Sequence, residues 1–116
     1  MKRVLAVLLL SVLAVAGCST SDTPAADTAS YTAIIDVRTP AEFATEHVVD
    51  AVNIDVQSAD FAQQIAQLDP NGSYLVYCRS GNRSAAAAAQ MSGAGLTVTD
   101  GGGLGDMKGA GWSFTS

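Results

Sequence analysis

The stretch that decides the fold is residues 73–93, Ser-Tyr-Leu-Val-Tyr-Cys-Arg-Ser-Gly-Asn-Arg-Ser-Ala-Ala-Ala-Ala-Ala-Gln-Met-Ser-Gly. Residues 74–77 are apolar and β-prone, which predicts a short buried strand. Residues 84–91 are rich in alanine, the best helix former. Residues 78–83 must then form the turn between strand and helix. This arrangement places Cys78 at a strand end, facing the N-terminus of a helix.

The turn has the chemistry of an anion site. The first amide N–H groups of a helix lack partners within the helix and carry roughly +0.5 of an elementary charge. Together with Arg79 and Arg83 they should favour the thiolate of Cys78, which is the nucleophilic form. Gly81 lets the turn bend so that successive N–H groups point inward. The turn is therefore predicted to hold a negatively charged sulfur or an oxyanion. The plainer alternative for Cys78 is a small buried hydrophobic residue.

Substrate-binding residues are expected in the same turn. We expect Arg79 to contact the substrate, whereas Arg83 is equally suited to binding it, to pairing with Asp36 or to bracing the loop. The side chains of Ser80, Asn82 and Ser84 could add hydrogen-bond donors, although we expect them mainly to be solvated. The candidate set around the nucleophile Cys78 is Arg79, Ser80, Gly81, Asn82 and Arg83.

Three stretches resemble one protein family. The sequence Tyr-Cys-Arg-Ser-Gly-Asn-Arg-Ser at residues 77–84 resembles the active-site loop of the rhodanese (thiosulfate sulfurtransferase) family. Asp-Val-Arg-Thr-Pro-Ala-Glu-Phe at residues 36–43 is similar to its Asp-Val-Arg-x-Pro-x-Glu-Phe signature. Residues 47–54 resemble its His-Ile-x-Gly-Ala-x-Asn segment, with Asp50 in place of the usual glycine. Aspartate tolerates left-handed backbone better than most residues, so we expect this turn to survive.

The resemblance implies a sulfurtransferase that works without a metal or organic cofactor. Cys78 would take the outer sulfur of a donor such as thiosulfate as a persulfide, and a thiol or cyanide would then accept it. Asp36 and Arg38 follow a strand, where a salt bridge between structural elements is expected rather than chemistry. The family counterpart of His47 belongs to a structural signature. We therefore assign Asp36, Arg38 and His47 to structural support.

Two other function classes stay open. A non-catalytic binding module could keep the fold and lose the chemistry. Cysteine phosphatases and arsenate reductases use a similar loop, but they place arginine one residue later, in a Cys-x5-Arg pattern. Here the spacing is Cys78-x4-Arg83. The shorter loop should suit a sulfur atom better than a phosphate.

The remaining patterns predict an α/β fold. Thr39-Pro40-Ala41-Glu42 reads as a capping box with proline at the first helical position. Strands that alternate with helices imply a small open parallel sheet with helices on both faces. Ligands of such sheets bind beyond the carboxyl ends of the strands, where Cys78 lies. The expected elements are strands at 33–37, 51–54, 74–77 and 96–99, and helices at 40–46, 58–68 (capped by Ser58), 84–91 and, weakly, 104–112.

The sequence of residues 1–18 predicts that the protein is exported from the cytoplasm. Lys2 and Arg3 precede the apolar residues 4–16, a run too short to span a bilayer comfortably, since this needs about 20 residues. The ending Val-Ala-Gly-Cys resembles a bacterial lipobox. This implies a lipoprotein signal peptide at 1–17, a lipid on Cys18, a flexible tether at 18–32 and a domain at 33–116 on the extracytoplasmic side of the cell membrane. An uncleaved anchor or an ordinary secretory signal is the alternative.

Charge and cysteine content narrow the partners. Residues 18–116 hold four basic residues against eleven acidic ones, a formal charge of −7, which argues against nucleic acid or anionic lipid surfaces. Two of the four basic residues lie in the turn, which favours a small anionic substrate. With Cys18 lipidated, Cys78 is the single thiol, so neither an intramolecular disulfide nor a Cys-x-x-Cys exchange site is expected. His47 has no ligand candidates near it in the sequence, so no metal is expected.

Overall fold

The computed structural model describes residues 28–116. The predicted signal peptide, the predicted lipid attachment at Cys18 and most of the predicted tether lie outside these residues. Within 28–116, no helix has the length and the apolar character needed to cross a membrane.

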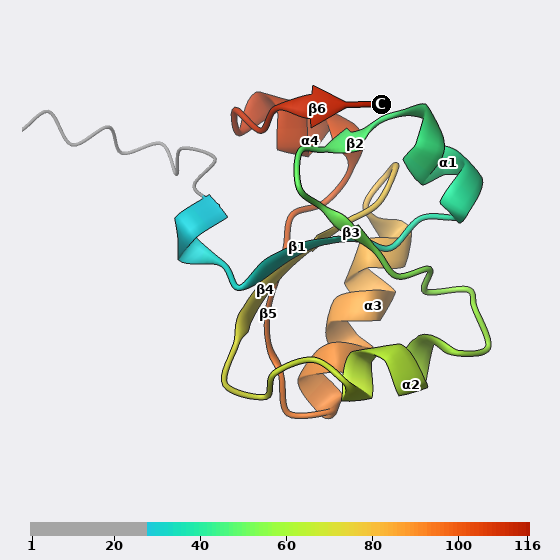
Figure 1. Ribbon diagram of the computed structural model, residues 1–116, viewed down its shortest axis with the longest axis vertical. Coiled ribbons are helices and arrows are strands. Elements are labelled where there is room, and N and C mark those ends of the chain that lie inside the picture. Colours follow the sequence, from blue (N-terminus) through green and yellow to red (C-terminus); the bar gives the residue numbers. More distant parts are fainter. Residues whose placement is uncertain (1–27) are drawn as a thin grey trace, which may run out of the picture.

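The centre of the molecule is a parallel sheet of four strands in the order β3-β1-β4-β5 (Figure 1). β1 pairs with β3 on one side and with β4 on the other, and β4 also pairs with β5. Buried, β-prone residues fill β1 and β4, as expected for the inner strands of a parallel sheet. The predicted α/β class is confirmed. The strands are β1 Ala33–Asp36, β3 Val52–Asn53, β4 Ser73–Tyr77 and β5 Thr97–Asp100.

Helices cover both faces of the sheet, and each face has its own apolar core. On one face, α2 (Phe61–Ala66) and α3 (Asn82–Gly93) enclose a cluster that includes Cys78 and Met91. On the other face, α4 (Leu104–Gly109) and the chain that follows it pack around Tyr77, Met107 and Trp112. Figure 1 shows α2 and α3 together at one side of the strands and α4 at the other. Cys78 therefore belongs to the core beneath α3.

The region after β1 follows the local signals closely. α1 (Pro40–Thr45) begins with the predicted capping box, in which Thr39 Oγ1 accepts a hydrogen bond from the Glu42 N–H group. Asp50 adopts a left-handed backbone, φ 67°, so the expected turn is present. A small antiparallel pair of β2 (His47–Val48) and β6 (Phe114–Thr115) was not predicted. Two residues per strand are too few to leave a periodic pattern in the sequence.

Two helix starts differ from the predicted ones. α3 begins at Asn82, two residues earlier than predicted, and Gly81 is its N-cap. The alanine run of α3 packs on the sheet through Ala87, which is fully buried, whereas Ala85, Ala86 and Ala89 are exposed. α2 takes Asp60 as its N-cap rather than Ser58, whose hydroxyl accepts a hydrogen bond from the Asp60 N–H group.

The last residues of the predicted tether are part of the folded unit. Thr28–Ser30 form a short 3-10 helix, η1. The Tyr31 ring that follows lies 6.3 Å from the ring of Trp112 and packs against the core beside α4. Residues 28–31 therefore pack with the domain predicted for residues 33–116.

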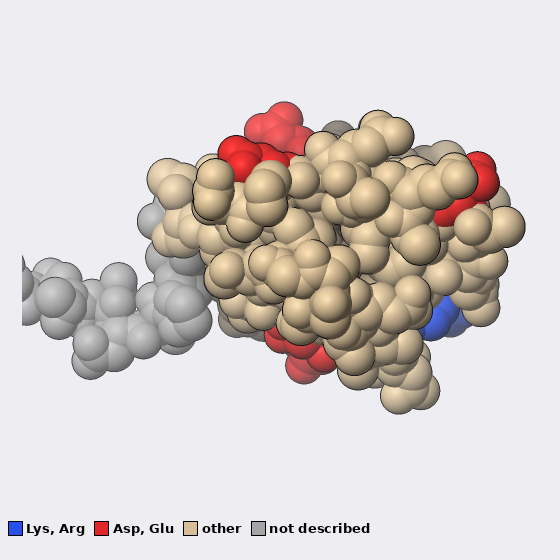
Figure 2. All heavy atoms as spheres, turned by 90° about the horizontal axis from the view of Figure 1, so that it is seen from below, with Lys and Arg blue, Asp and Glu red and all other residues tan. Residues whose placement is uncertain are grey.

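One face of the molecule is sparsely charged. Figure 2 views the molecule from below Figure 1 and shows mainly uncharged side chains, with scattered Asp and Glu and with Lys or Arg at one edge. This distribution agrees with the acidic composition of the chain. The arginines of the Cys78 turn are therefore an uncommon concentration of positive charge on this protein.

Candidate active site

Cys78 follows β4 directly, at the carboxyl end of the strand, and the loop closes around its sulfur. Gly81 has a left-handed backbone, φ 100°, which turns the chain so that its N–H group points back at the sulfur. The distance from Gly81 N to Cys78 Sγ is 2.9 Å. The predicted inward-facing turn is present.

The Cys78 thiol is fully buried, and its pKa lies below the ordinary value. Burial alone raises the pKa of Cys78. Hydrogen bonds from the Ser84 side chain and from the amides of Ser84, Gly81 and Ser80 outweigh that effect and lower the pKa. The burial matches the plain alternative for a free cysteine, but a purely structural cysteine has no need of converging donors. The site therefore combines a covered sulfur with an environment suited to its anion.

Ser84 has a different position from the one we expected. Its side chain is fully buried rather than solvated, and its Oγ lies 3.4 Å from Cys78 Sγ. The same hydroxyl is 3.0 Å from the carbonyl oxygen of Gly81 and 3.3 Å from that of Gly102. Because α3 begins at Asn82, Ser84 falls in its first turn and faces the sulfur. The expectation of solvation holds for Ser80 and Asn82, which are exposed.

Residues 101–103, all glycine, support the loop from behind. The carbonyl oxygen of Gly102 accepts a hydrogen bond from the Cys78 N–H group at 2.9 Å. A Cβ at Gly103 would lie 2.6 Å from the carbonyl oxygen of Arg79, so the two backbones approach as closely as glycine allows. The run follows the strand predicted at residues 96–99, and we made no prediction for it. Three successive glycines were the available signal for such a close approach.

Arg83 braces the loop rather than pairing with Asp36. Its Nη1 and Nη2 atoms donate to Glu42 Oε1 and Oε2 at 2.7 and 2.9 Å, a two-point contact between α3 and α1. The hydrogen bond from Arg83 lowers the pKa of Glu42 to about 2, so this carboxylate is ionised at neutral pH. Glu42 is thus a supporting residue that sequence analysis gave only a local capping role.

Arg79 is an exposed residue of the loop. Of the basic residues in the described range, Arg38, Arg83 and Lys108 are in ion pairs and Arg79 is not. Arg79 lines an open pocket of about 300 Å³. The other lining residues are Arg38, Glu42, Thr45, Glu46 and Leu104. Arg79 is therefore the one of these four basic residues whose charge is not paired.

Asp36 and Arg38 form a buried pair at the end of β1. Arg38 Nη2 is 2.7 Å from Asp36 Oδ2, and Arg38 Nε lies 3.0 Å from each carboxylate oxygen. Burial lowers the pKa of Arg38, but hydrogen bonding and charge from Asp36 raise it more. The side-chain amide of Asn53 donates to the carbonyl oxygens of Asp36 and Arg38, at 3.0 and 2.9 Å. These contacts fix the chain where β1 leads into α1.

His47 is held by its neighbours on α1. Its ring stacks on that of Phe43, with 3.8 Å between the centroids, and its Nδ1 is 2.8 Å from the Phe43 carbonyl oxygen. Because a carbonyl oxygen can only accept, Nδ1 carries the proton in this contact. In the part of the chain that the structure describes, no three His, Cys, Asp or Glu side chains gather closely enough to hold a metal ion.

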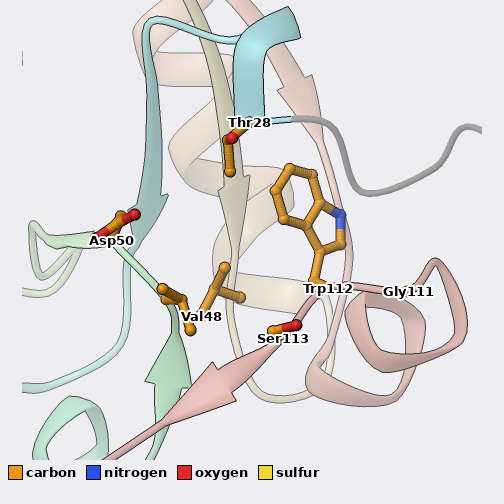
Figure 3. Close-up of a pocket in the computed structure, with 7 residues that line it drawn as sticks. Thr28, Val48, Asp50, Gly111, Trp112 and Ser113 are labelled. Atoms are coloured by element: carbon orange, nitrogen blue, oxygen red, sulfur yellow. The ribbon is translucent and has the colours of Figure 1, made fainter.

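A second, larger pocket lies away from Cys78. It has a volume of about 480 Å³ and lies between η1, the turn after β2 and the chain after α4, beside Trp112 (Figure 3). Among its described lining residues Asp50 is the one ionisable side chain. The lining residues are Thr28, Val48, Val49, Asp50, Gly111, Trp112 and Ser113. Its hydroxyl residues, Thr28 and Ser113, have no histidine or lysine beside them among the lining residues to act as a base, so the pocket does not compete with the Cys78 loop as an active site.

The fold and loop define an α/β protein with a cysteine at the end of an inner strand, cradled by backbone amides. Residues 22–103 match the rhodanese-like domain family, and the chain belongs to that family. A curated relative, thiosulfate sulfurtransferase PspE of Escherichia coli K12, is 38% identical over 74 residues, which cover 63% of this chain and 71% of that protein. The combination supports a transferase-type function.

Further similar proteins agree with this assignment. Thiosulfate sulfurtransferase GlpE of Pseudomonas syringae pv. syringae B728a is 38% identical over 65 residues, 55% of this chain and 58% of that protein. The match therefore spans somewhat over half the length of that relative. Among solved structures, a rhodanese with anions from E. coli superposes with a TM-score of 0.62 at 32% identity, covering 72% of this chain and 96% of the other. The fold is thus that of the rhodanese family.

Proposed function

We propose that this protein is a sulfurtransferase that carries sulfur as a persulfide on Cys78. The observation that carries the proposal is the convergence of the Gly81 amide and the Ser84 hydroxyl on Cys78 Sγ, at 2.9 and 3.4 Å. The Gly81 amide donates to the sulfur and stabilises the thiolate, which is the nucleophile in covalent catalysis, and the Ser84 hydroxyl, which accepts from the thiol, can donate once the thiol is ionised. The sulfurtransferase relatives support the reaction class.

The first half-reaction loads the cysteine. The Cys78 thiolate attacks the outer sulfur of a donor such as thiosulfate and forms an S–S bond. The bond between that sulfur and the sulfonate sulfur breaks, and sulfite leaves with the electron pair. The terminal persulfide sulfur is anionic and can accept hydrogen bonds from the loop amides, which suits an amide-lined turn. Arg79, exposed at the loop and free of an ion pair, is suited to bind the sulfonate end of the donor.

The second half-reaction removes the transferred sulfur from Cys78. A thiophilic acceptor, cyanide or a thiolate, attacks the terminal sulfur, and the Cys78 Sγ–S bond breaks. Its electron pair returns to Sγ, so the thiolate is regenerated. No redox cofactor or metal is required by this balance, and the kinetics are of the ping-pong type.

The proposal is tested by the mass of the intact chain after incubation with thiosulfate. The expected product carries one additional sulfur atom on Cys78, and cyanide should remove it with release of thiocyanate. A Cys78→Ser variant should show neither step. Sulfur transfer that persists in Cys78→Ser would rule out the mechanism.

A binding module is the second candidate, and the full burial of Cys78 favours it. A module of this kind would hold its partner equally well with serine at position 78 and would never form the persulfide. The same Cys78→Ser variant therefore separates the two functions. Phosphatase substrates assayed beside thiosulfate test the remaining enzyme class.

We also propose that the domain works on the extracytoplasmic side of the cell membrane, held there by a lipid on Cys18. The support is the basic, apolar and small-residue pattern of residues 1–18. Mass analysis of the membrane-associated protein should find Cys18 as the acylated first residue. An intact residue 1–17 segment on the purified protein would contradict the proposal.

A further inference from the structure

A single carboxylate, that of Glu42, holds the second arginine of the loop. Arg83 Nη1 and Nη2 each donate to one oxygen of Glu42, at 2.7 and 2.9 Å. The Thr39 hydroxyl and backbone N–H also donate to Glu42 Oε1, at 3.1 and 3.3 Å. The position of Glu42 is therefore fixed from its own helix, and both outer nitrogens of Arg83 are engaged by it.

The guanidinium of Arg83 nevertheless lies within electrostatic reach of Cys78. The pKa of Arg83 is raised, first by its hydrogen bond to Glu42 and the charge of that carboxylate, and further by the Cys78 thiolate. Arg83 stands in the first turn of α3, whose free amides face the same site. A cation next to an amide-lined loop is the usual means of binding a phosphate or sulfate group. In this protein the cation, Arg83, is already paired with the carboxylate of Glu42.

We propose that Glu42 is a specificity-determining residue, which keeps Arg83 from binding oxyanions in the Cys78 loop. With Arg83 engaged, the loop interior offers backbone N–H groups and the Ser84 hydroxyl, a set that suits one sulfur atom. Arg79, whose side chain is exposed in the same loop, is then the unpaired cation for the anionic end of a donor. The role given to Arg79 rests on the proposed sulfurtransferase function. The exclusion of oxyanions by Glu42 can be tested without that function.

The test uses Glu42→Gln, because glutamine also completes a capping box and has nearly the same shape. The matched control is Glu46→Gln, since Glu46 lies just after the same helix and pairs with Lys108 rather than with Arg83. Both variants lose one negative charge, but only Glu42→Gln removes the charge and the two-point contact that hold Arg83. The double variant Glu42→Gln/Arg83→Gln removes the released cation.

The measurement is the protection of Cys78 from iodoacetamide by inorganic phosphate, at constant ionic strength. Alkylation is followed at the Cys78 peptide by mass spectrometry, because Cys18 is a second cysteine in the full chain. In Glu42→Gln we expect phosphate to slow alkylation with an apparent Kd at least about tenfold lower than in the unchanged protein. Glu46→Gln and the double variant should behave like the unchanged protein.

Three results would overturn the proposal: Glu42→Gln that is folded but no better protected, Glu46→Gln that is protected equally, or protection that survives in the double variant. Should Glu42→Gln not fold, Glu42→Asp replaces it with the same expectations, because the shorter side chain cannot keep both hydrogen bonds to Arg83. Persulfide formation from thiosulfate is scored separately by intact mass. If no persulfide forms, the proposed sulfurtransferase function is contradicted, but the phosphate experiment still tests the role of Glu42.

Discussion

Two ion pairs at the same end of the sheet have equal contact distances and very different surroundings. Arg38 and Asp36 meet at 2.7 Å with side chains 3% and 0% exposed. Arg83 and Glu42 also meet at 2.7 Å, but their side chains are 25% and 28% exposed. A buried charge that loses its partner has no access to water, whereas a half-exposed one is readily hydrated. The contact distance therefore says little about what each pair does.

The comparison distinguishes a region that supports the fold, around Arg38 and Asp36, from a region that controls the Cys78 loop, around Arg83 and Glu42. The Arg38–Asp36 pair sits between β1 and α1 and is tied to the backbone through Asn53. The Arg83–Glu42 pair joins α1 to α3 beside the Cys78 loop. We therefore expect changes in the first region to alter the stability of the fold, and changes near the loop to alter the reactivity of Cys78.

The largest effect is expected from Arg38→Ala. This change leaves the Asp36 carboxylate buried without its partner, which costs about 3–5 kcal/mol in the free energy of unfolding. The measurement is urea-induced unfolding at neutral pH. The double variant Asp36→Asn/Arg38→Met should recover part of the loss, because it leaves no unpaired charge. A loss of less than about 1 kcal/mol in Arg38→Ala would show that the pair is not structurally important.

The next largest effect is expected from Ser84→Ala, which should change the reactivity of the Cys78 thiol. Losing the hydroxyl that lies 3.4 Å from the sulfur should raise the pKa of Cys78, because the hydrogen bond with the Ser84 side chain is the strongest of the contacts that lower it. The measurement is the rate of Cys78 alkylation by iodoacetamide as a function of pH. Ser80→Ala is the matched control, since the exposed Ser80 contributes through its amide, which alanine keeps. Identical pH profiles for the two variants would contradict the role given to the Ser84 side chain.

Much of the fold could be predicted because its signals are local. The capping box at Thr39 and Glu42, the apolar run of β4 and the glycine in the Cys78 turn each lie within a few residues of what they determine. The pairing of β2 with β6 joins His47 to Thr115. A contact between such distant residues leaves no pattern in either segment, so it could not be predicted.

The candidate site also has features that the local sequence predicts and features that depend on distant contacts. The position of Cys78 and the inward-facing amide of Gly81 follow from a strand, a glycine and a helix in succession. The burial of Ser84 depends on where α3 begins and on the packing of Gly102 behind the loop. The partner of Arg83 was missed because Glu42 lies 41 residues earlier, where its capping role already explained it.

The smallest effect is expected for the Glu42–Arg83 pair, and it depends on pH. The pKa of Glu42 falls from 4.5 to about 2 on folding, so the folded state favours the carboxylate. The resulting stability is complete above pH 4.5 and is lost as the pH falls through about 2. For a pair this exposed we expect at most about 1 kcal/mol at neutral pH.

Comparing the unfolding free energies of the unchanged protein and Glu42→Gln across this range checks that expectation. The difference should be constant above pH 4.5 and shrink towards zero near pH 2, because the protonated carboxyl no longer pairs with Arg83. Lys108→Ala is the reference, since the Lys108–Glu46 pair is 51% and 37% exposed and should contribute less than about 0.5 kcal/mol. A Glu42→Gln difference that stays unchanged down to pH 2 would mean that glutamine acts through the cap of α1 rather than through Arg83.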